Sequence, residues 1–307
     1  DPGDQRLPRP EAGYRGAAMF PSGHPGSLHL EPRTEPAPAA VVTDDPRLAL
    51  GIAQRTLERP LMFNHARGLW GYRGRTATGQ EVLVQAAGLG ASSTAIVCQD
   101  LAALGVSTIV GVWACAALDG HPPLGALTVA ERVVRVDAVA AALLRAAADG
   151  DDDRAGSEQS ISTSRLDRCA GAAPGKTRAA TAAPGPAATR PAATLSGACD
   201  RALVGAARSL GAVPVACASH ELAAGAAMRA PADRDGRAVV CDMSTATLLA
   251  AAVVAGVRAC ALLVVDQHPG AGAPARLTPP ARDEALVRAG ATAVSLAASA
   301  SGDAAPG

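Results

Sequence analysis

Short apolar runs of strand length alternate with helix-forming segments along most of this chain. The runs AAVVT, RAVVCDM and RACALLVVD have strand length, and segments such as STATLLAAAVVAGV have helix length. Near-continuous apolar runs are typical of strands that are buried on both faces, and the alternation places helices on both sides of a parallel sheet. We therefore predict an α/β fold with a mostly parallel sheet that helices cover on both faces.

Two segments lack the large apolar residues that a core requires. Residues 1–37 are rich in proline and glycine, and residues 149–197 begin with an acidic run and continue as alanine, proline and threonine. Such composition does not bury enough surface to offset the entropy of folding. We expect a disordered leader at 1–37, a disordered insertion at 149–197 and a tail at 301–307. Residues 38–148 and 198–300 then form a single domain.

Charge and cysteine content exclude several classes of function. The 28 basic and 28 acidic residues balance, so no electrostatic attraction to nucleic acid or to an acidic membrane is expected. No apolar run reaches the roughly 18 residues of a membrane span. The seven cysteines form no C-x-x-C pair, and the histidines show no metal-ligand spacing. We expect no metal, no cofactor and, because no signal peptide is recognised, a cytoplasmic location.

Two glycine-containing segments are candidates for binding an anion. GAAPGKT, at 171–177, has one residue too few between its glycines for a phosphate loop and lies in low-complexity sequence, so we interpret it as linker. GLGASS, at 88–93, follows a predicted strand and precedes a predicted helix, where backbone N–H groups hold anions. It lacks a dinucleotide fingerprint, and close packing explains its glycines equally well.

The ends of three predicted strands are candidate ligand positions. Asp242 and Asp266 each end a strand, where α/β enzymes place acid and base groups, although either one equally fits a helix cap. The stretch STIVGVWACAALDG, at 107–120, ends a third strand but offers a bulky Trp113 and no charge before Asp119. The residues alone leave open whether this turn is a binding loop without its ligands.

Several segments, taken in order, resemble the nucleoside phosphorylase-I family, which includes uridine phosphorylase, hexameric purine nucleoside phosphorylase and related nucleosidases. These segments are LMFNHARGLWGYRG, VQAAGLGASSTAIVCQDLAALGV, VWACAALDG, VVCDMSTATLLAAAVVAGVRACALLVVD and EALVRAGATAVSLA. The resemblance covers about residues 39–148 and 198–298. It implies a three-layer α/β/α fold with a central mixed, mostly parallel sheet, and a homo-oligomer (a dimer or a trimer of dimers).

The resemblance also implies a reaction, in which inorganic phosphate cleaves the N-glycosidic bond of a ribonucleoside to give free base and ribose 1-phosphate. Nucleoside and phosphate would be the partners. Arg67 matches the arginine that serves the phosphate site of a neighbouring subunit. Gly88 and Gly90 match the loop beneath the ribose, and Ser92 of that loop is a further substrate-binding candidate.

The second half of the chain supplies the remaining candidates. Met243 matches the methionine beside the sugar, and Asp242 and Ser244 flank it as substrate-binding candidates. Asp266 matches the acid that serves the base, although an ungapped alignment places Gln267 there.

The family's phosphate-binding motifs are altered in this chain. The motif G-D-P-x-R begins here with Asp44 in place of glycine, and its arginine is displaced by one position to Arg47. The motif R-V-G-[ST]-C-G has Gly111 in place of its arginine and Ala114 in place of its hydroxyl residue. Ser244 replaces the ribose-binding glutamate.

Three hypotheses of function follow. The first is a nucleoside phosphorylase, of weak activity or altered specificity. The second is a catalytically degenerate paralogue that binds a nucleoside or assembles with an active partner. The third is a hydrolytic nucleosidase, which needs no phosphate ligands but needs carboxylates for water and ribose; Ser244 argues against it. The sequence shows no motif that distinguishes purine from pyrimidine.

Overall fold

The computed structural model describes residues 29–118, 120–135, 137–154, 198–219, 239–268 and 275–302. Parts of the predicted leader and tail, and residues 155–197 of the predicted insertion, lie outside these ranges. The strands are β1 (Ala39–Thr43), β2 (Glu58–Asn64), β3 (Gly71–Arg75), β4 (Glu81–Ala86), β5 (Thr108–Ala117), β6 (Leu127–Arg135), β7 (Val213–Ser219), β8 (Val239–Asp242), β9 (Arg258–His268) and β10 (Ala275–Arg276). The helices are α1 (Pro46–Thr56), α2 (Gly90–Ala103), α3 (Ala138–Arg154), α4 (Arg201–Ser209), α5 (Thr245–Ala255) and α6 (Pro279–Gly302), with a 3-10 turn η1 at Ala66–Gly68.

The described strands form one mixed sheet whose centre is parallel. Strand β1 lies between β4 and β5 and runs parallel to both, and β5 runs parallel to β9 along almost its whole length. Beyond β9 the order is β6, β7 and β8, and β8 pairs antiparallel with β5. Strands β5, β9, β6, β7 and β8 therefore close into a ring, while β4, β3 and β2 form an antiparallel extension.

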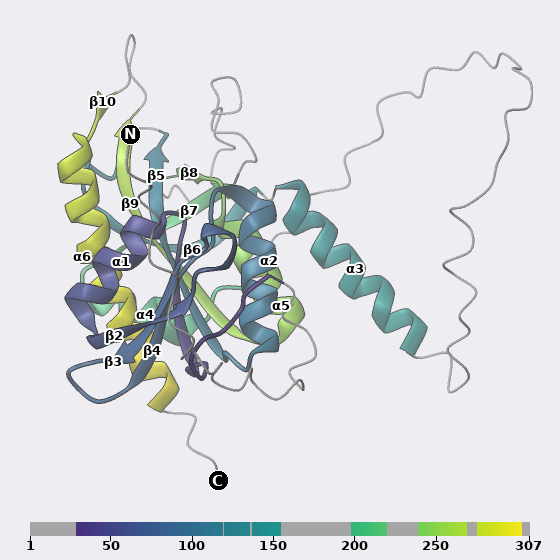
Figure 1. Ribbon diagram of the computed structural model, residues 1–307. Coiled ribbons are helices and arrows are strands. Elements are labelled where there is room, and N and C mark those ends of the chain that lie inside the picture. Colours follow the sequence, from purple (N-terminus) through teal and green to yellow (C-terminus); the bar gives the residue numbers. More distant parts are fainter. Residues whose placement is uncertain are drawn as a thin grey trace, which may run out of the picture.

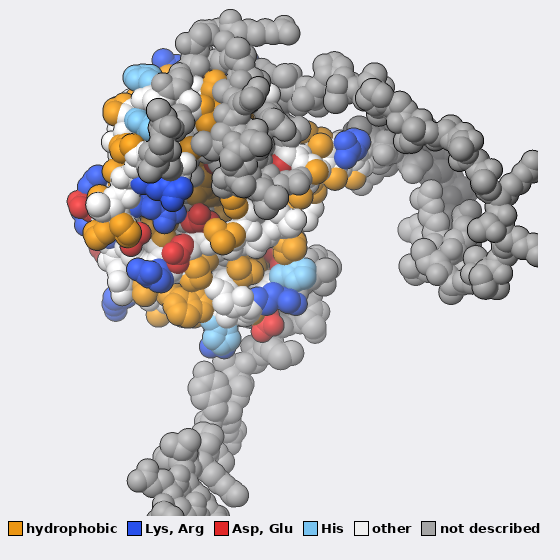
Figure 2. Space-filling model, turned by 90° about the horizontal axis from the view of Figure 1, so that it is seen from above, with side chains coloured by type: hydrophobic (Ala, Val, Ile, Leu, Met, Phe, Trp, Pro, Cys, Tyr) orange, Lys and Arg blue, Asp and Glu red, His pale blue; other side chains and the backbone are white. Residues whose placement is uncertain are grey.

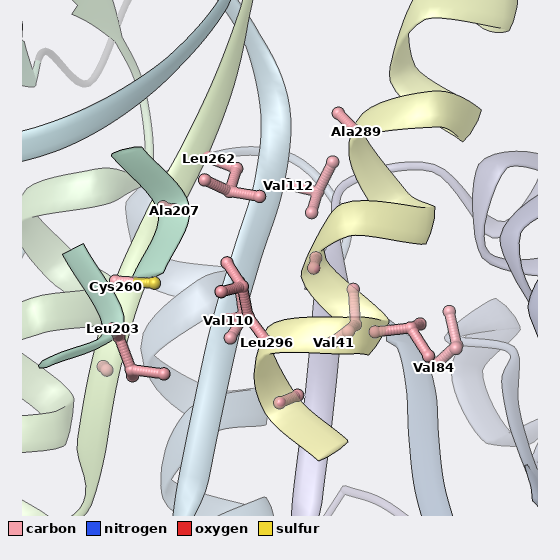
Figure 3. Close-up of a cluster of buried hydrophobic side chains, with 14 of the residues drawn as sticks. Val41, Val84, Val110, Val112, Leu203, Ala207, Cys260, Leu262, Ala289 and Leu296 are labelled. Carbon is pink, nitrogen blue, oxygen red and sulfur yellow. The ribbon is translucent and has the colours of Figure 1, made fainter. Parts of the chain in front are cut away.

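Helices cover both faces of the sheet, as predicted from the alternation of strands and helices. Helices α1, α4 and α6 pack on one face, and α2 and α5 pack on the other (Figure 1). The β-branched side chains Val41, Val84, Val110 and Val112 project from neighbouring strands toward α6 (Figure 3). None of the helices in the described ranges has both the length and the apolar character needed to cross a membrane.

Most predicted elements are present, and the differences have physical reasons. Strands β3 and β4 pair as an antiparallel hairpin. Strand β2 was missed because Pro60 interrupts its pattern, but a proline is tolerated in an edge strand. Helix α3 continues to Arg154, into the acidic start of the insertion predicted at 149–197.

Residues 29–37, which the sequence analysis placed in the leader, contact the domain. The side chain of Leu30 is buried, and the backbone N–H groups of His29 and Leu30 donate to Asp100 Oδ2 of α2 at 2.8 and 2.9 Å. These contacts could not be predicted from the composition of the segment, because they depend on one leucine and on backbone groups.

Helices α1 and α6 approach closely because glycine lies at their contact. A Cβ atom on Gly290 of α6 would lie 2.3 Å from Ile52 Cγ1 of α1, and Ile52 is fully buried. Small residues permit this packing in a chain with only 2% aromatic residues.

We expect Gly290→Ala to lower the free energy of unfolding by about 1–3 kcal/mol, because the new methyl group overpacks the α1–α6 contact. Gly205→Ala in α4 is the matched control, since no atom lies within 4 Å of its added Cβ. The control is expected to leave stability unchanged or to raise it by up to about 1 kcal/mol. Urea denaturation measures both, and equal effects of the two variants would contradict the packing argument.

Candidate active site

A cavity of about 240 Å³ lies at the carboxyl ends of β1, β5, β8 and β9, where α/β proteins hold ligands. Figure 2 looks down on this end of the molecule and shows acidic and basic side chains close together beside hydrophobic ones. The cavity is lined by Asp44, Leu89, Gly90, Trp113–Ala116, Cys241–Ser244, Asp266, Gln267 and Arg282.

Five of the predicted site residues line this cavity. They are Gly90, Asp242, Met243, Ser244 and Asp266, which come from three separate segments of the chain. Gly90 has a left-handed backbone (φ 81°) and begins α2, which has no side-chain cap. Backbone N–H groups at the start of α2 are therefore available to a ligand oxygen.

Arg47 does not line the cavity. Its side chain is 83% exposed, and its closest acidic partner is Asp283 at the start of α6, at 3.7 Å. Arg47 belongs to the first turn of α1, whose N-terminus is capped by Asp45. The displacement of the arginine by one position therefore directs it to the surface and away from the cavity.

Arg67, Gly88 and Ser92 also lie outside the cavity lining. Arg67 is exposed and left-handed (φ 57°), in the turn η1. The turn is held beside the glycine loop, since Gln85 Nε2 donates to Leu69 O at 2.8 Å and Leu69 reaches within 3.4 Å of the Cβ position of Gly88. Ser92 is exposed on α2.

The carboxylate of Asp242 is surrounded by protein donors. Its Oδ2 accepts from Trp113 Nε1 at 2.5 Å, from Thr245 N at 2.8 Å and from Thr245 Oγ1 at 2.5 Å. Its Oδ1 accepts from Ser219 Oγ at 2.6 Å and from Cys217 Sγ at 3.3 Å. Of the two alternatives that the sequence left open, this geometry favours a helix cap over an acid or base, because the Asp242 carboxylate accepts from the backbone N–H groups of Ser244 and Thr245 at the start of α5.

Trp113 fills the space beside Gly111. A Cβ atom on Gly111 would lie 2.4 Å from Trp113 Cη2 and 2.7 Å from Leu248 Cδ2, so no larger residue fits there while the indole keeps its place. In the sequence, a small residue (Gly111) stands two positions before a large one (Trp113). This spacing does not show that the indole packs over the glycine.

Arg282 is a cavity residue that the sequence analysis missed. It lies in the first turn of α6, and its Nε donates to Asp266 Oδ2 at 3.0 Å. Burial raises the pKa of Asp266 above its ordinary value of 3.8, while Arg282 acts in the opposite direction. The segment LTPPAR predicts an arginine in the first turn of a helix. Only the tertiary structure shows that this helix begins beside the end of β9.

Asp44 extends the acidic character of the cavity. It directly follows β1 and lines the cavity. Burial raises its pKa above 3.8, and Asp266 adds to the increase, whereas Arg282 lowers it. From the sequence, Asp44 is interpreted only as the loss of a glycine, whereas in the structure it lines the cavity.

A second cavity, of about 270 Å³, lies on β2, β3 and β4 and offers less chemistry. Two of its guanidinium groups already have a partner, since Arg73 and Arg75 contact Glu81 at 2.5 and 3.2 Å. Among the described residues, no group of three or more His, Cys, Asp or Glu side chains is placed to hold a metal ion.

We expect Trp113→Phe to lower the free energy of unfolding by about 1–3 kcal/mol, because it leaves the buried Asp242 carboxylate without its indole donor. Trp70→Phe is the matched control, since Trp70 is 40% exposed. Chemical denaturation followed by circular dichroism measures both. If Trp113→Phe is as stable as the control, the Asp242 hydrogen bonds do not carry the stability assigned to them.

Comparisons with known proteins agree with the fold. Residues 38–300 match the sequence profile of the Phosphorylase superfamily. A 94-residue segment is 34% identical to the purine nucleoside phosphorylase DeoD-type of Oceanobacillus iheyensis; it covers 30% of this chain and 40% of that protein. The matched residues include every described strand and helix, except for the last residues of α6. The chain belongs to the phosphorylase superfamily.

Proposed function

We propose that this chain cleaves the N-glycosidic bond of a ribonucleoside, as a nucleoside phosphorylase of weak phosphate affinity. The observation that carries the proposal is the half-buried Asp266–Arg282 pair, which lies in a cavity at the carboxyl ends of the strands. A carboxyl group with a raised pKa suits proton donation to a leaving base.

The cavity also offers an apolar surface and hydrogen-bond donors, both of which a bound ribose would need. Met243 supplies an apolar surface, and the uncapped start of α2 at Gly90 supplies N–H donors for ribose or phosphate oxygens. The relative from Oceanobacillus iheyensis is named as a purine nucleoside phosphorylase, but the matched segment spans only 40% of it. We therefore extend the proposal to ribonucleosides in general and not to a particular base.

Phosphate binding is expected to be weak. Each charge-assisted hydrogen bond to phosphate contributes roughly 1.5–3 kcal/mol. The absence of two arginines and a hydroxyl from the altered motifs removes on the order of 4–8 kcal/mol, or ~10³–10⁵ in affinity. Arg282 is the one guanidinium that lines the described part of the cavity, and Asp266 already engages it.

A catalytically degenerate paralogue is the second candidate function. The observation in its favour is Trp113, which fills the space beside Gly111 and is held there by the Asp242 carboxylate. Such a protein would keep the nucleoside cavity but would release no base, with or without phosphate.

The functional test measures free base from uridine, inosine and methylthioadenosine, with and without phosphate. We expect the wild-type chain to release base from one of them, and Asp266→Asn to lower the rate by about 10²- to 10⁴-fold, because the amide cannot donate the same proton. Asp283→Asn is the matched control, since Asp283 is exposed on the same helix start as Arg282. Nucleoside binding without any base release would instead support the degenerate paralogue.

We also propose a homo-oligomer that includes the face next to Arg67. Leu61, Trp70 and Leu89 are 58%, 40% and 75% exposed, which is unusual for large apolar residues in one region of a monomer. Leu89 lines the mouth of the cavity, so a second subunit on this face would lie close to the ligand. The six described cysteines are buried and not in disulfide bonds. The cytoplasmic location stays a prediction.

We expect Leu61→Asp to shift the oligomer toward monomer in analytical ultracentrifugation, because it places a charge in an apolar contact. Leu210→Asp is the matched control, because Leu210 is 54% exposed but follows α4 on the opposite side of the sheet. A monomeric wild-type chain, or equal masses for both variants, would contradict the proposed interface.

A further inference from the structure

We propose that the second cavity, on β2, β3 and β4, binds a small ligand through an oxyanion group, either a phosphate or a carboxylate. The cavity has a volume of about 270 Å³, and its lining includes Arg59, Arg73, Arg75, Glu58 and Glu81. Guanidinium groups bind the oxygens of carboxylates and phosphates through paired hydrogen bonds. The inference does not depend on the proposed cleavage of a nucleoside.

This cavity is separate from the candidate active site. Among the described residues, none lines both cavities. Strand β4 runs parallel to β1, and Val82 of β4 pairs with Ala39 at the start of β1. Glu81 therefore lies at the amino end of these strands, whereas Asp44 of the candidate active site follows their carboxyl end. A ligand in the second cavity would not occupy the space of a ligand in the first.

A β-bulge in the edge strand β2 places Arg59 at the second cavity. Glu58 pairs with Arg75 and Leu61 pairs with Arg73, so two residues of β2 lie opposite one residue of β3. Arg59 lies in the bulge and has a left-handed backbone (φ 45°), which is uncommon for a residue with a side chain. Bulges re-orient side chains next to functional sites, and strained backbone is concentrated at such sites. The local geometry therefore supports a binding role for Arg59.

Arg59 is the guanidinium that the ion pairs of this cavity do not use. Arg73 Nη2 lies 2.5 Å from Glu81 Oε2 and Arg75 Nη2 lies 3.2 Å from Glu81 Oε1, so one carboxylate holds two arginines. Arg59 takes part in neither pair and is exposed at the edge of the sheet. When Glu58 is included, three arginines and two glutamates give the lining one net positive charge. This balance favours an anion.

Arg73 has a further N–H group to offer. Its Nε is buried and has no hydrogen-bond partner among the described residues. A buried donor without an acceptor is unfavourable, so an acceptor that reached it would stabilise the protein. An oxyanion carries several acceptor oxygens and is therefore a suitable ligand for both Arg59 and Arg73.

The size of the cavity and its apolar contact limit the class of ligand. A volume of about 270 Å³ is small for a ligand pocket, and Leu61 adds an apolar side chain to the charged lining. These properties match a small organic acid or a small phosphate ester, whose apolar part contacts Leu61 while its oxyanion binds the arginines. Inorganic phosphate and citrate are simple probes for the two kinds of oxyanion.

The experiment is calorimetric titration of the full chain with inorganic phosphate and, separately, with citrate, at constant ionic strength. We expect at least one probe to bind. Arg59→Gln should weaken this binding by about 10-fold or more, because it removes the unpaired guanidinium. Glu81→Gln should tighten it by about threefold, because it removes a negative charge and releases two arginines. Arg55→Gln is the matched control, since Arg55 is exposed in the last turn of α1 and does not line the cavity.

Opposite effects of Arg59→Gln and Glu81→Gln would support the site, because a general loss of structure does not tighten binding. Absence of binding by both probes overturns the proposal, and so does binding that Arg59→Gln leaves unchanged. Leu61 also belongs to the face proposed above for a second subunit. If Arg59→Gln lowers the mass in analytical ultracentrifugation, Arg59 contacts that subunit and the anion site is overturned. None of these measurements requires base release, so failure of the proposed function leaves them unaffected.

Discussion

The buried carboxylate of Asp242 joins the elements that frame the cavity. It ends β8, receives the indole N–H of Trp113 from β5, the hydroxyl of Ser219 from β7 and the backbone N–H of Thr245 from α5. Burial of a charged group costs several kcal/mol unless donors compensate it, so these strands and this helix are bound to one geometry. The ring of strands from β5 to β9 is closed at the point where Asp242 lies.

This interaction also decides what the cavity is able to bind. By holding the indole of Trp113 over Gly111, Asp242 keeps a bulky apolar group in the cavity wall and leaves no room for a longer side chain there. By occupying the start of α5, it fills an anion position with the protein's own carboxylate. The ligand space that remains is bordered by the charged side chains of Asp44, Asp266 and Arg282.

The order of strands and helices was predictable because period and length are local properties. The sheet centre, the β3–β4 hairpin and the helices of both layers follow from apolar runs and turn residues that the sequence displays openly. Strand β2 was not predictable, because a proline such as Pro60 is tolerated only in an edge strand, and tertiary pairing determines which strand lies at the edge. Of the predicted site residues, Gly90, Met243 and Asp266 line the cavity. Arg47 does not, because a shift of one position in a helical turn rotates a side chain by about 100°.

The sequence by itself determined the α/β class, the family and the absence of the usual phosphate arginines, because each is written in the identity and spacing of residues. Only the tertiary structure decided which polar groups are free. Asp242 and Asp44 are both aspartates at strand ends, yet one is saturated by donors from three other elements and the other opens on a cavity. The availability of a carboxylate depends on what folds around it, and contacts between residues that are more than a hundred positions apart are not encoded in any local pattern.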